Sequence, residues 1–279
     1  MKSKKLPCWA ALLGRPVLLG LAALVLICAT ACKPKVEKGD ITLKKGTLMI
    51  GMEIGYPPME YFDEDGNTPI GFDVEMGKAL AAKLGLQPEF IDTAWDGIFA
   101  GVETDKYDCI MSSVTYTEER AQKYNFTKPY VMNSQVLVVR KDFPVKPRSL
   151  EEIQGLRLTF QGETTSDELF QEWAEKTGTK IDVFRYDKVM YCFDELTLNR
   201  ADVILVDKVV ADSYLAKPGN PFEMTVQISD DEVLAVCLKK GNNALTDALN
   251  KALAELVAEG KLQQISQQIF GYDVVSSLW

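Results

Sequence analysis

The hydrophobic and polar positions along this chain of 279 residues switch repeatedly between the spacing of strands and that of helices. Residues 47–53 and 88–91 predict two strands, and the apolar positions of 74–84 recur with helical spacing. A further helix and a further strand are predicted at 95–102 and 107–111. Strands that alternate with helices in this way indicate a mostly parallel sheet with helices on its faces.

The same alternation starts again in the second half of the chain. Strands are predicted at 156–160, 181–184 and 202–206, with helices at 167–177 and 190–198. Long β-rich runs at 135–140 and 232–238 flank this block, and amphipathic helices follow at 243–259 and 262–269. We therefore predict an α/β fold of two lobes, each with a mostly parallel sheet flanked by helices, joined by two hinge crossings. The alternative is two independent domains in tandem.

The final helices provide too little chain for a third domain, so we expect them to complete the first lobe. The predicted limits are 47–135 plus 237–279 for the first lobe, and 136–236, including the hinge strands, for the second. Two crossings that flank a cleft form a hinge between lobes.

The first 46 residues have a different pattern. A basic start, the apolar run 17–27 and three small residues predict an export signal peptide over 1–31. Cys32 then occupies the position of a lipoprotein cysteine that is acylated after cleavage, although Ala29 stands where leucine is usual. Ordinary cleavage at the same bond, which leaves a free thiol, is the alternative. Residues 32–46 are polar and lysine-rich, and predict a lipid-tethered flexible linker.

Composition excludes several classes of function. Without the four basic residues of the predicted signal peptide, 27 Lys and Arg remain against 40 Asp and Glu, a formal charge of −13. This acidity argues against binding to nucleic acid. The chain contains no histidine, which excludes Ser-His-Asp catalysis and histidine-ligated zinc. Cys109, Cys192 and Cys237 stand singly in apolar surroundings, so we expect buried thiols and no disulfide framework.

The segment 112–120, Ser-Ser-Val-Thr-Tyr-Thr-Glu-Glu-Arg, lies where a predicted strand passes into a helix. A helix N-terminus offers free N–H donors and partial positive charge to an anion. Arg120, one turn inside the helix, can donate two hydrogen bonds to a carboxylate. The segment suits a ligand with a carboxylate and requires no bond breaking. The alternative is structural, with Thr117 as an N-cap and Arg120 as a solvated helix residue.

Seven motifs follow one another between Gly46 and Phe270. They are Gly51-x-x-x-x-Tyr56-Pro57-Pro58-Met59-Glu60, Gly71-Phe72-Asp73-Val74, Trp95-Asp96-Gly97-Ile98, Ser112 to Arg120, Asn125-Phe126-x-x-Pro129-Tyr130, Asn199-Arg200-Ala201-Asp202 and Glu259-Gly260-Lys261-Leu262. In these motifs the chain resembles the bacterial extracellular solute-binding proteins of the polar amino acid type, the receptors of ABC importers. The resemblance implies the two-lobed type II periplasmic-binding architecture.

The resemblance also implies which residues bind an amino acid. It places the ligand α-carboxylate on Arg120, with Thr115 as a donor beside it. It places the α-ammonium on Asp207, with the backbone carbonyl of Ser113 as a second acceptor. A zwitterion bound in this way is satisfied by one charge from each lobe once the cleft closes. The alternative for Asp207 is a helix N-cap.

Members of the family have a loop of glycine and threonine residues in their second lobe, and residues 162–167 correspond to it in this chain. Glu163 departs from the family pattern in this loop. The resemblance implies Thr165 as a second donor to the carboxylate, and the alternative is that these hydroxyls cap the following helix.

Tyr56 and Trp95 match the aromatic positions that flank the ligand side chain, although either could be a core residue. Glu53 matches an acidic position at the floor of the pocket, and Glu60 either contributes there or lies on the surface. An acid beside two aromatic faces favours a basic amino acid such as arginine or lysine, although related proteins with an acid at this position accept glutamine.

The predicted function is therefore that of a substrate-binding lipoprotein, which captures an L-amino acid and delivers it to ABC permease subunits. We expect a monomer outside the cytoplasm, anchored to the membrane through Cys32, with no metal, cofactor or catalytic residue. The alternative is an enzyme on the same fold, similar to cyclohexadienyl dehydratase, and the pairing of Asp207 with Arg120 favours the receptor.

Overall fold

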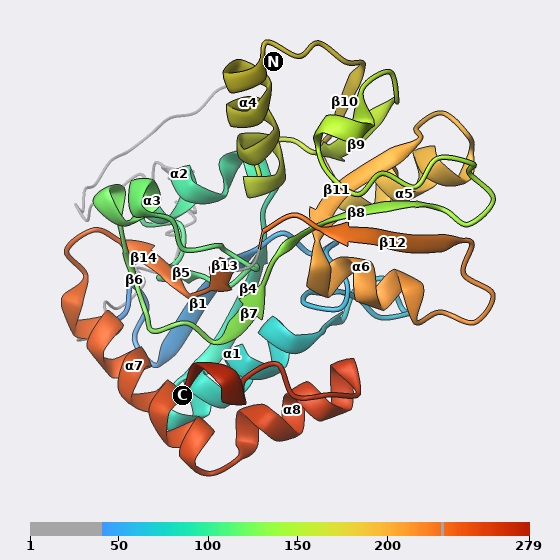
Figure 1. Ribbon diagram of the computed structural model, residues 1–279. Helices are drawn as coiled ribbons and strands as arrows, with labels where there is room; N and C mark the ends of the chain where they lie inside the picture. Colours follow the sequence, from blue (N-terminus) through green and yellow to red (C-terminus); the bar gives the residue numbers. More distant parts are fainter. Residues whose placement is uncertain (1–40, 230–231) are drawn as a thin grey trace, which may run out of the picture. The chain divides into compact units, whose positions relative to one another are not determined.

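The computed structural model describes residues 41–229 and 232–279, and two five-stranded sheets organise them (Figure 1). The first sheet has the order β4 (Gln87–Asp92), β1 (Thr47–Met52), β5 (Cys109–Ile110), β14 (Cys237–Lys239) and β6 (Tyr124–Phe126). The second has the order β10 (Val183–Tyr186), β9 (Leu158–Gln161), β11 (Val203–Asp207), β8 (Gln135–Arg140) and β12 (Phe222–Gln227).

Both sheets have the same internal plan. In the first sheet β1 is parallel to β4 and β5, and in the second β9 is parallel to β10 and β11. The strands that enter each sheet after a crossing, β14 and β8, are antiparallel to both of their neighbours. The chain crosses from the first sheet to the second through β7 (Val131–Asn133) and returns through β13 (Glu232–Leu234). These two strands pair with each other. The predicted α/β fold is confirmed.

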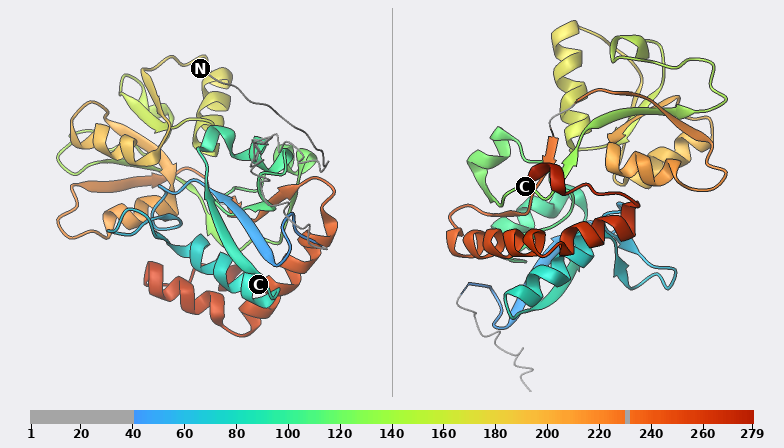
Figure 2. Two further views of the ribbon diagram at one scale, coloured as in Figure 1. Left: turned by 180° about the vertical axis from the view of Figure 1, so that it is seen from behind. Right: turned by 60° about the horizontal axis from the view of Figure 1, so that its bottom comes forward.

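Helices cover each sheet, and we call each sheet with its helices a lobe. The first lobe contains α1 (Phe72–Lys83), η1 (Trp95–Gly97), α2 (Ile98–Glu103), α3 (Glu118–Lys123), α7 (Asn243–Ala258) and α8 (Lys261–Phe270). The second contains η2 (Glu151–Ile153), α4 (Thr165–Thr177), α5 (Val189–Thr197) and α6 (Lys208–Leu215). Short elements complete the set, namely β2 (Tyr61–Phe62), β3 (Pro69–Ile70) and η3 (Ser276–Leu278). Helices α1, α7 and α8 pack against one another in the first lobe (Figure 2).

Local chemistry explains where the helices near the cleft begin. Gly71 precedes α1 with φ 123°, and a Cβ atom there would lie 2.3 Å from the carbonyl oxygen of Met59. A side chain at this position is therefore excluded by both the backbone conformation and the available space. Helix α3 begins after Thr117, whose hydroxyl accepts a hydrogen bond from the backbone N–H of Arg120 at 3.1 Å.

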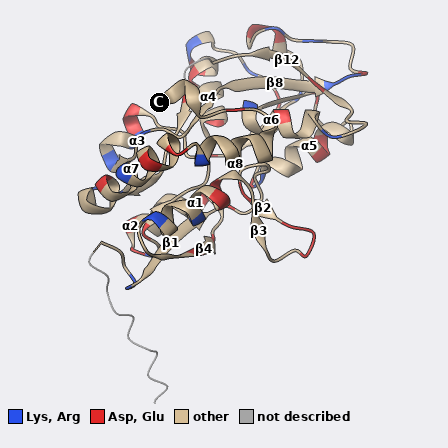
Figure 3. Ribbon diagram, turned by 90° about the horizontal axis from the view of Figure 1, so that it is seen from below, with Lys and Arg blue, Asp and Glu red and all other residues tan. Residues whose placement is uncertain are grey.

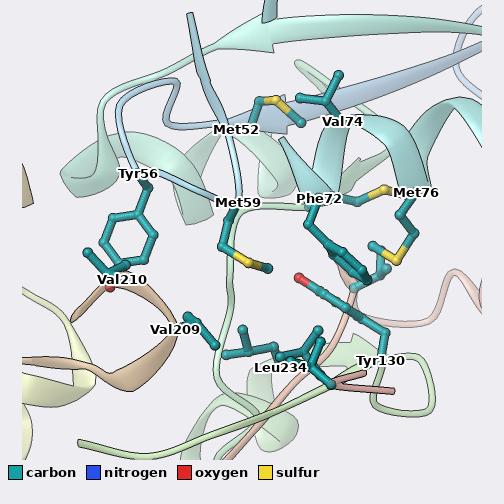
Figure 4. Close-up of a cluster of buried hydrophobic side chains, with 14 of the residues drawn as sticks. Met52, Tyr56, Met59, Phe72, Val74, Met76, Tyr130, Val209, Val210 and Leu234 are labelled. Atoms are coloured by element: carbon teal, nitrogen blue, oxygen red, sulfur yellow. The ribbon is translucent and has the colours of Figure 1, made fainter. Parts of the chain in front are cut away.

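The largest apolar cluster runs through both lobes. Figure 4 shows Tyr56, from the loop after β1, beside Val210 of α6, with Met59 between Tyr56 and Phe72. Since Tyr56 and Phe72 belong to the first lobe and Val210 to the second, apolar packing continues from one lobe to the other. A second cluster in the second lobe, which includes Leu137 and Phe160, lies apart from it.

The structure differs from the prediction at several places, since α6, β12 and the short strands β2, β3, β6 and β7 were not predicted. Two further differences concern the second hinge crossing and the linker. The β-rich run 232–238 is split into β13 and β14, because Ala235 leaves the hinge pair and donates its N–H to Val114 in the first lobe. Part of the predicted flexible linker packs on the first lobe. There the backbone N–H of Leu43 donates to Asp108 at 2.6 Å, and Lys44 forms an ion pair with Glu89.

Other features agree with the sequence or fall outside the described residues. Cys109, Cys192 and Cys237 are buried free thiols, as expected, whereas Cys32 and the predicted signal peptide lie outside the described residues. Acidic and basic positions alternate over α1, α3 and α7 on the face that Figure 3 shows. Within 41–229 and 232–279, none of the helices is sufficiently long and apolar to cross a membrane.

Candidate ligand-binding site

The site is assembled from loops that follow the strands of both lobes. The first lobe contributes the loop after β1, the η1 turn and the segment between β5 and α3, and the second contributes the loop after β9 and the end of β11. These segments line a cavity of about 20 Å³. The side chains that line it are Glu53, Tyr56, Glu60, Trp95, Ser112, Ser113, Gln161, Thr164 and Asp207.

Five of the eight predicted ligand-binding residues line this cavity, namely Glu53, Tyr56, Trp95, Ser113 and Asp207. The other three lie next to it. Thr115 and Thr165 face each other across the two lobes, with their hydroxyl oxygens 3.5 Å apart. In the loop that contains Glu163, it is Thr164 that lines the cavity, while Thr165 is the first residue of α4. Glu163 has φ 60°, so the loop turns sharply at the residue that departs from the family pattern.

Arg120 is buried and fixed by contacts from three directions. Its Nη1 donates to the backbone oxygen of Thr115 and its Nη2 to a carboxylate oxygen of Glu168, each at 3.1 Å. The guanidinium carbon lies 5.4 Å from the ring centroid of Phe99 and 6.0 Å from that of Trp95. A guanidinium has five N–H donors, so these two bonds leave donors for a further carboxylate. The structure thus presents a buried cation at the side of the cavity, and the solvated position considered above is excluded.

Asp207 supplies a buried anion from the second lobe. Its two carboxylate oxygens accept hydrogen bonds from the Tyr56 hydroxyl at 2.8 Å and from the Gln135 side-chain amide at 2.6 Å. Burial raises the pKa of Asp207, and hydrogen bonds from Asn133, Tyr56 and Gln135 and the charge of Arg120 oppose this rise. Although Asp207 immediately precedes α6, its side chain makes no capping hydrogen bond. The alternative of an N-cap is therefore not supported.

Glu53 also lines the cavity and is 2% exposed. One carboxylate oxygen accepts a hydrogen bond from the side-chain amide of Gln161 in the second lobe at 2.6 Å. Burial raises the pKa of Glu53 to about 7, while the Gln161 bond and the charge of Lys188 act in the opposite direction. The Gln161 amide also donates to the backbone oxygen of Asp187 at 2.9 Å.

The two predicted aromatic residues also connect the lobes. Tyr56 bonds to Asp207, and the indole N–H of Trp95 donates to the backbone oxygen of Glu163 at 2.9 Å. Each of the two side chains is 9% exposed and each borders the cavity. They are therefore positioned to contact a ligand, although each also belongs to an apolar cluster.

Two more buried acids are Glu60, which lines the cavity, and its neighbour Asp73. The hydroxyl of Ser112 donates to Glu60 at 2.7 Å, and Asp73 accepts hydrogen bonds from the backbone N–H of Ser113 and the hydroxyl of Tyr130. Burial and the neighbouring Asp73 raise the pKa of Glu60, and burial raises that of Asp73 to about 7. Glu60 is 1% exposed, so its alternative placement on the surface is wrong.

Sequence reasoning missed Gln161, Gln135 and Glu168 as residues of the site. Glutamine and glutamate are common on surfaces, and only the folded chain brings these three to Glu53, Asp207 and Arg120. The position of Gln161, directly before the glycine of the loop, was the one available signal.

Several buried polar atoms at the cavity have no partner within the described residues. They include Glu53 Oε1, Ser113 Oγ and Gln161 Oε1. The Gln161 oxygen, and the Glu53 oxygen when its carboxyl is ionised, are acceptors only, and buried polar groups usually find a hydrogen bond. The cavity therefore has unused acceptors at Glu53 and Gln161, which suit a ligand with N–H donors beside them.

The fold and this site define a two-lobed receptor with a buried cation and buried anions around one cavity. The chain belongs to the bacterial extracellular solute-binding proteins, family 3, whose model matches residues 48–272. It is 31% identical over 264 residues to the L-cystine-binding protein TcyJ of Escherichia coli (strain K12), which covers 94% of this chain and 97% of that protein. It is 32% identical over 240 residues to a probable amino-acid ABC transporter-binding protein of Haemophilus influenzae, over 85% of this chain and 90% of that one.

Among solved structures, an ancestral arginine-binding protein bound to arginine has a TM-score of 0.76 and 32% identity, covering 81% of this chain and 99% of its own. These similarities confirm the predicted family, and with it the binding of amino acids in ABC transport outside the cytoplasm. The family and these relatives are solute-binding proteins and not enzymes, so the enzymatic alternative is not supported.

Proposed function

We propose that this chain captures an L-amino acid that carries a positive charge beyond its α-ammonium group. Arginine and lysine are the first candidates, and cystine, which has two ammonium groups, also meets this description. The observation that carries the proposal is the set of unused acceptors at Glu53 and Gln161, which line the cavity.

The roles we propose follow the charges of the two lobes. Arg120 binds the α-carboxylate with help from Thr115 and, from the second lobe, a threonine hydroxyl of the 164–165 pair. Asp207 binds the α-ammonium together with the backbone carbonyl of Ser113. Because Arg120 and Asp207 belong to different lobes, a ligand that contacts both stabilises the closed arrangement.

Side-chain recognition involves the two aromatic residues and the buried acid. Tyr56 and Trp95 flank the stem of the ligand side chain, and their ring faces attract a cation. Glu53 then accepts its N–H groups. The hydrogen bond from Gln161 to Glu53 is then replaced by a hydrogen bond from the ligand, so the ionised form of Glu53 gains a charged partner.

We further propose that the mature protein is a monomer, tethered to the membrane by acylated Cys32, that delivers its ligand to ABC permease subunits. Acylation at this position is tested by Cys32→Ala in cells, with fractionation of membrane and soluble material. The proposal predicts that the variant leaves the membrane fraction, whereas unchanged fractionation contradicts it.

Ligand binding is tested by calorimetric titration of residues 33–279, unfolded and refolded first to remove bound ligand. The panel contains the proteinogenic amino acids, ornithine and cystine. Binding confined to arginine, lysine, ornithine or cystine supports the proposal. Tight binding of a neutral amino acid contradicts the assigned role of Glu53, and no binding to any of them contradicts the whole proposal.

A further inference from the structure

Lys188 reaches from the second lobe to the loop that carries Glu53. It occupies the N-cap position of α5, and a Cβ atom built on Gly55 would lie 3.3 Å from its Nζ. Gly55 stands between Glu53 and Tyr56 in the sequence, so the lysine ammonium lies beside the loop that carries these two lining residues of the cavity. Lys188 is half-buried, and Nζ has no hydrogen bond or ion pair with any described residue.

This lysine completes a second pair of opposite charges, with the lobes in reversed roles. In the first pair the cation, Arg120, comes from the first lobe and the anion, Asp207, from the second. In the second pair the anion, Glu53, comes from the first lobe and the cation, Lys188, from the second. Burial raises the pKa of Glu53, and the Gln161 bond and the charge of Lys188 oppose this rise, while Asp92 and Asp187 add to it.

There is space for a ligand to continue beyond Glu53. A second cavity of about 200 Å³ borders Trp95, Glu163, Tyr186 and Asp187, so it shares the Trp95 side chain with the inner cavity. The side chain of Gln161 links Glu53 to the backbone of Asp187. The part of the inner cavity that Gln161 lines therefore lies against the turn that carries Asp187 and Lys188.

We propose that Lys188 binds a second carboxylate at the distal end of the ligand, while Glu53 binds a second ammonium group. This inference rests on the proposed function and makes it more specific. The ligand class is then a molecule with two amino-acid headgroups joined through their side chains, such as a disulfide- or thioether-linked diamino dicarboxylic acid. A simple basic amino acid brings only a cation to this end, where the ammonium of Lys188 repels it.

The test measures selectivity by calorimetry on refolded residues 33–279. The ligands are L-cystine and L-cystathionine, with two headgroups, and L-arginine, with one. In Lys188→Met, which keeps the aliphatic stem, affinity for the first two falls about tenfold or more while affinity for arginine is unchanged or higher. Lys188→Glu moves the preference further towards arginine. Lys176→Met, at an exposed lysine of α4, is the matched control and leaves all three affinities unchanged.

Each remaining outcome overturns the inference. If the wild type prefers arginine and Lys188→Met changes nothing, the inference is wrong and the proposed function stands. Equal losses for all three ligands indicate a structural role for Lys188 and also contradict it. If the wild type binds none of the three ligands and no other amino acid, the proposed function fails together with the inference.

Discussion

The guanidinium of Arg120 in the first lobe forms an ion pair with the carboxylate of Glu168 in the second, at 3.1 Å. The side chain of Arg120 is 10% exposed and that of Glu168 is 50% exposed, so the pair lies at the edge of the cleft. Glu168 thus offers Arg120 the same chemical group that the α-carboxylate of an amino acid offers. The contact also joins the two lobes, because α3 carries the arginine and α4 the glutamate.

Glu168→Gln is expected to increase ligand affinity about two- to fivefold. An ion pair with one partner half exposed contributes roughly 0.5–1 kcal/mol, and the substitution removes a competitor for the guanidinium. Calorimetric titration measures the change, with Glu172→Gln on the same helix as the control, since Glu172 pairs only with the exposed Lys176 in the described structure. A loss of affinity in Glu168→Gln instead shows that the pair supports the liganded form.

Arg120→Ala is expected to abolish measurable binding. It removes the buried cation that balances both Asp207 and the ligand carboxylate, and loss of one partner of a buried charge pair costs about 2–5 kcal/mol. Circular dichroism confirms that the variant is folded before titration. Retained micromolar affinity in a folded Arg120→Ala protein refutes the assignment of Arg120.

The sequence predicted the elements of the fold because their signals are local. The helical spacing of 74–84 and the capping residue Thr117 are properties of neighbouring residues, and the structure contains both helices. The break of the run 232–238 was missed, because all seven residues suit a strand and only the return of the chain to the first sheet separates β13 from β14. The packing of Leu43 on Asp108 was missed for a similar reason, since Asp108 is distant in sequence.

The same distinction applies to the site. Arg120 and Asp207 were candidates because each stands in a recognisable segment, and both are buried, Asp207 as a lining residue of the cavity and Arg120 beside Trp95. Gln161 does not stand in a recognisable motif. Its role at the site comes from hydrogen bonds to Glu53 and Asp187, which only the tertiary structure brings close to it. Residues whose partners lie far away in the chain could not be found from one sequence.

Trp95→Ala is expected to weaken ligand binding by about 1–3 kcal/mol, which corresponds to roughly 5- to 150-fold in Kd. The substitution removes an aromatic face from the cavity and also the hydrogen bond to Glu163 across the lobes. Trp95→Phe keeps a ring and loses only that hydrogen bond, so it separates the two effects. Unchanged affinity in both variants shows that Trp95 packs in the core and does not contribute to ligand binding.

The stability of the unliganded protein is expected to decrease as pH rises from about 5 to 7.5. Burial raises the pKa of Glu53 from 4.5 to about 7, so between these values the folded state holds more protons than the unfolded state. Each pH unit in this range then lowers the free energy of unfolding, by up to about 3 kcal/mol in total for Glu53. Above pH 7.5 this contribution no longer changes.

Glu53→Gln removes this contribution, because an amide does not titrate, and therefore flattens the pH dependence of the free energy of unfolding. Other groups around Glu53 also carry charge, namely Lys188, Asp92 and Asp187, and Asp73 keeps its own raised pKa, so part of the slope remains. Denaturant titrations at pH 5, 6, 7 and 8 provide the measurement. Glu64→Gln in the exposed turn is the control and retains the wild-type slope. An equal slope in Glu53→Gln and the wild type means that Glu53 is ionised throughout this range.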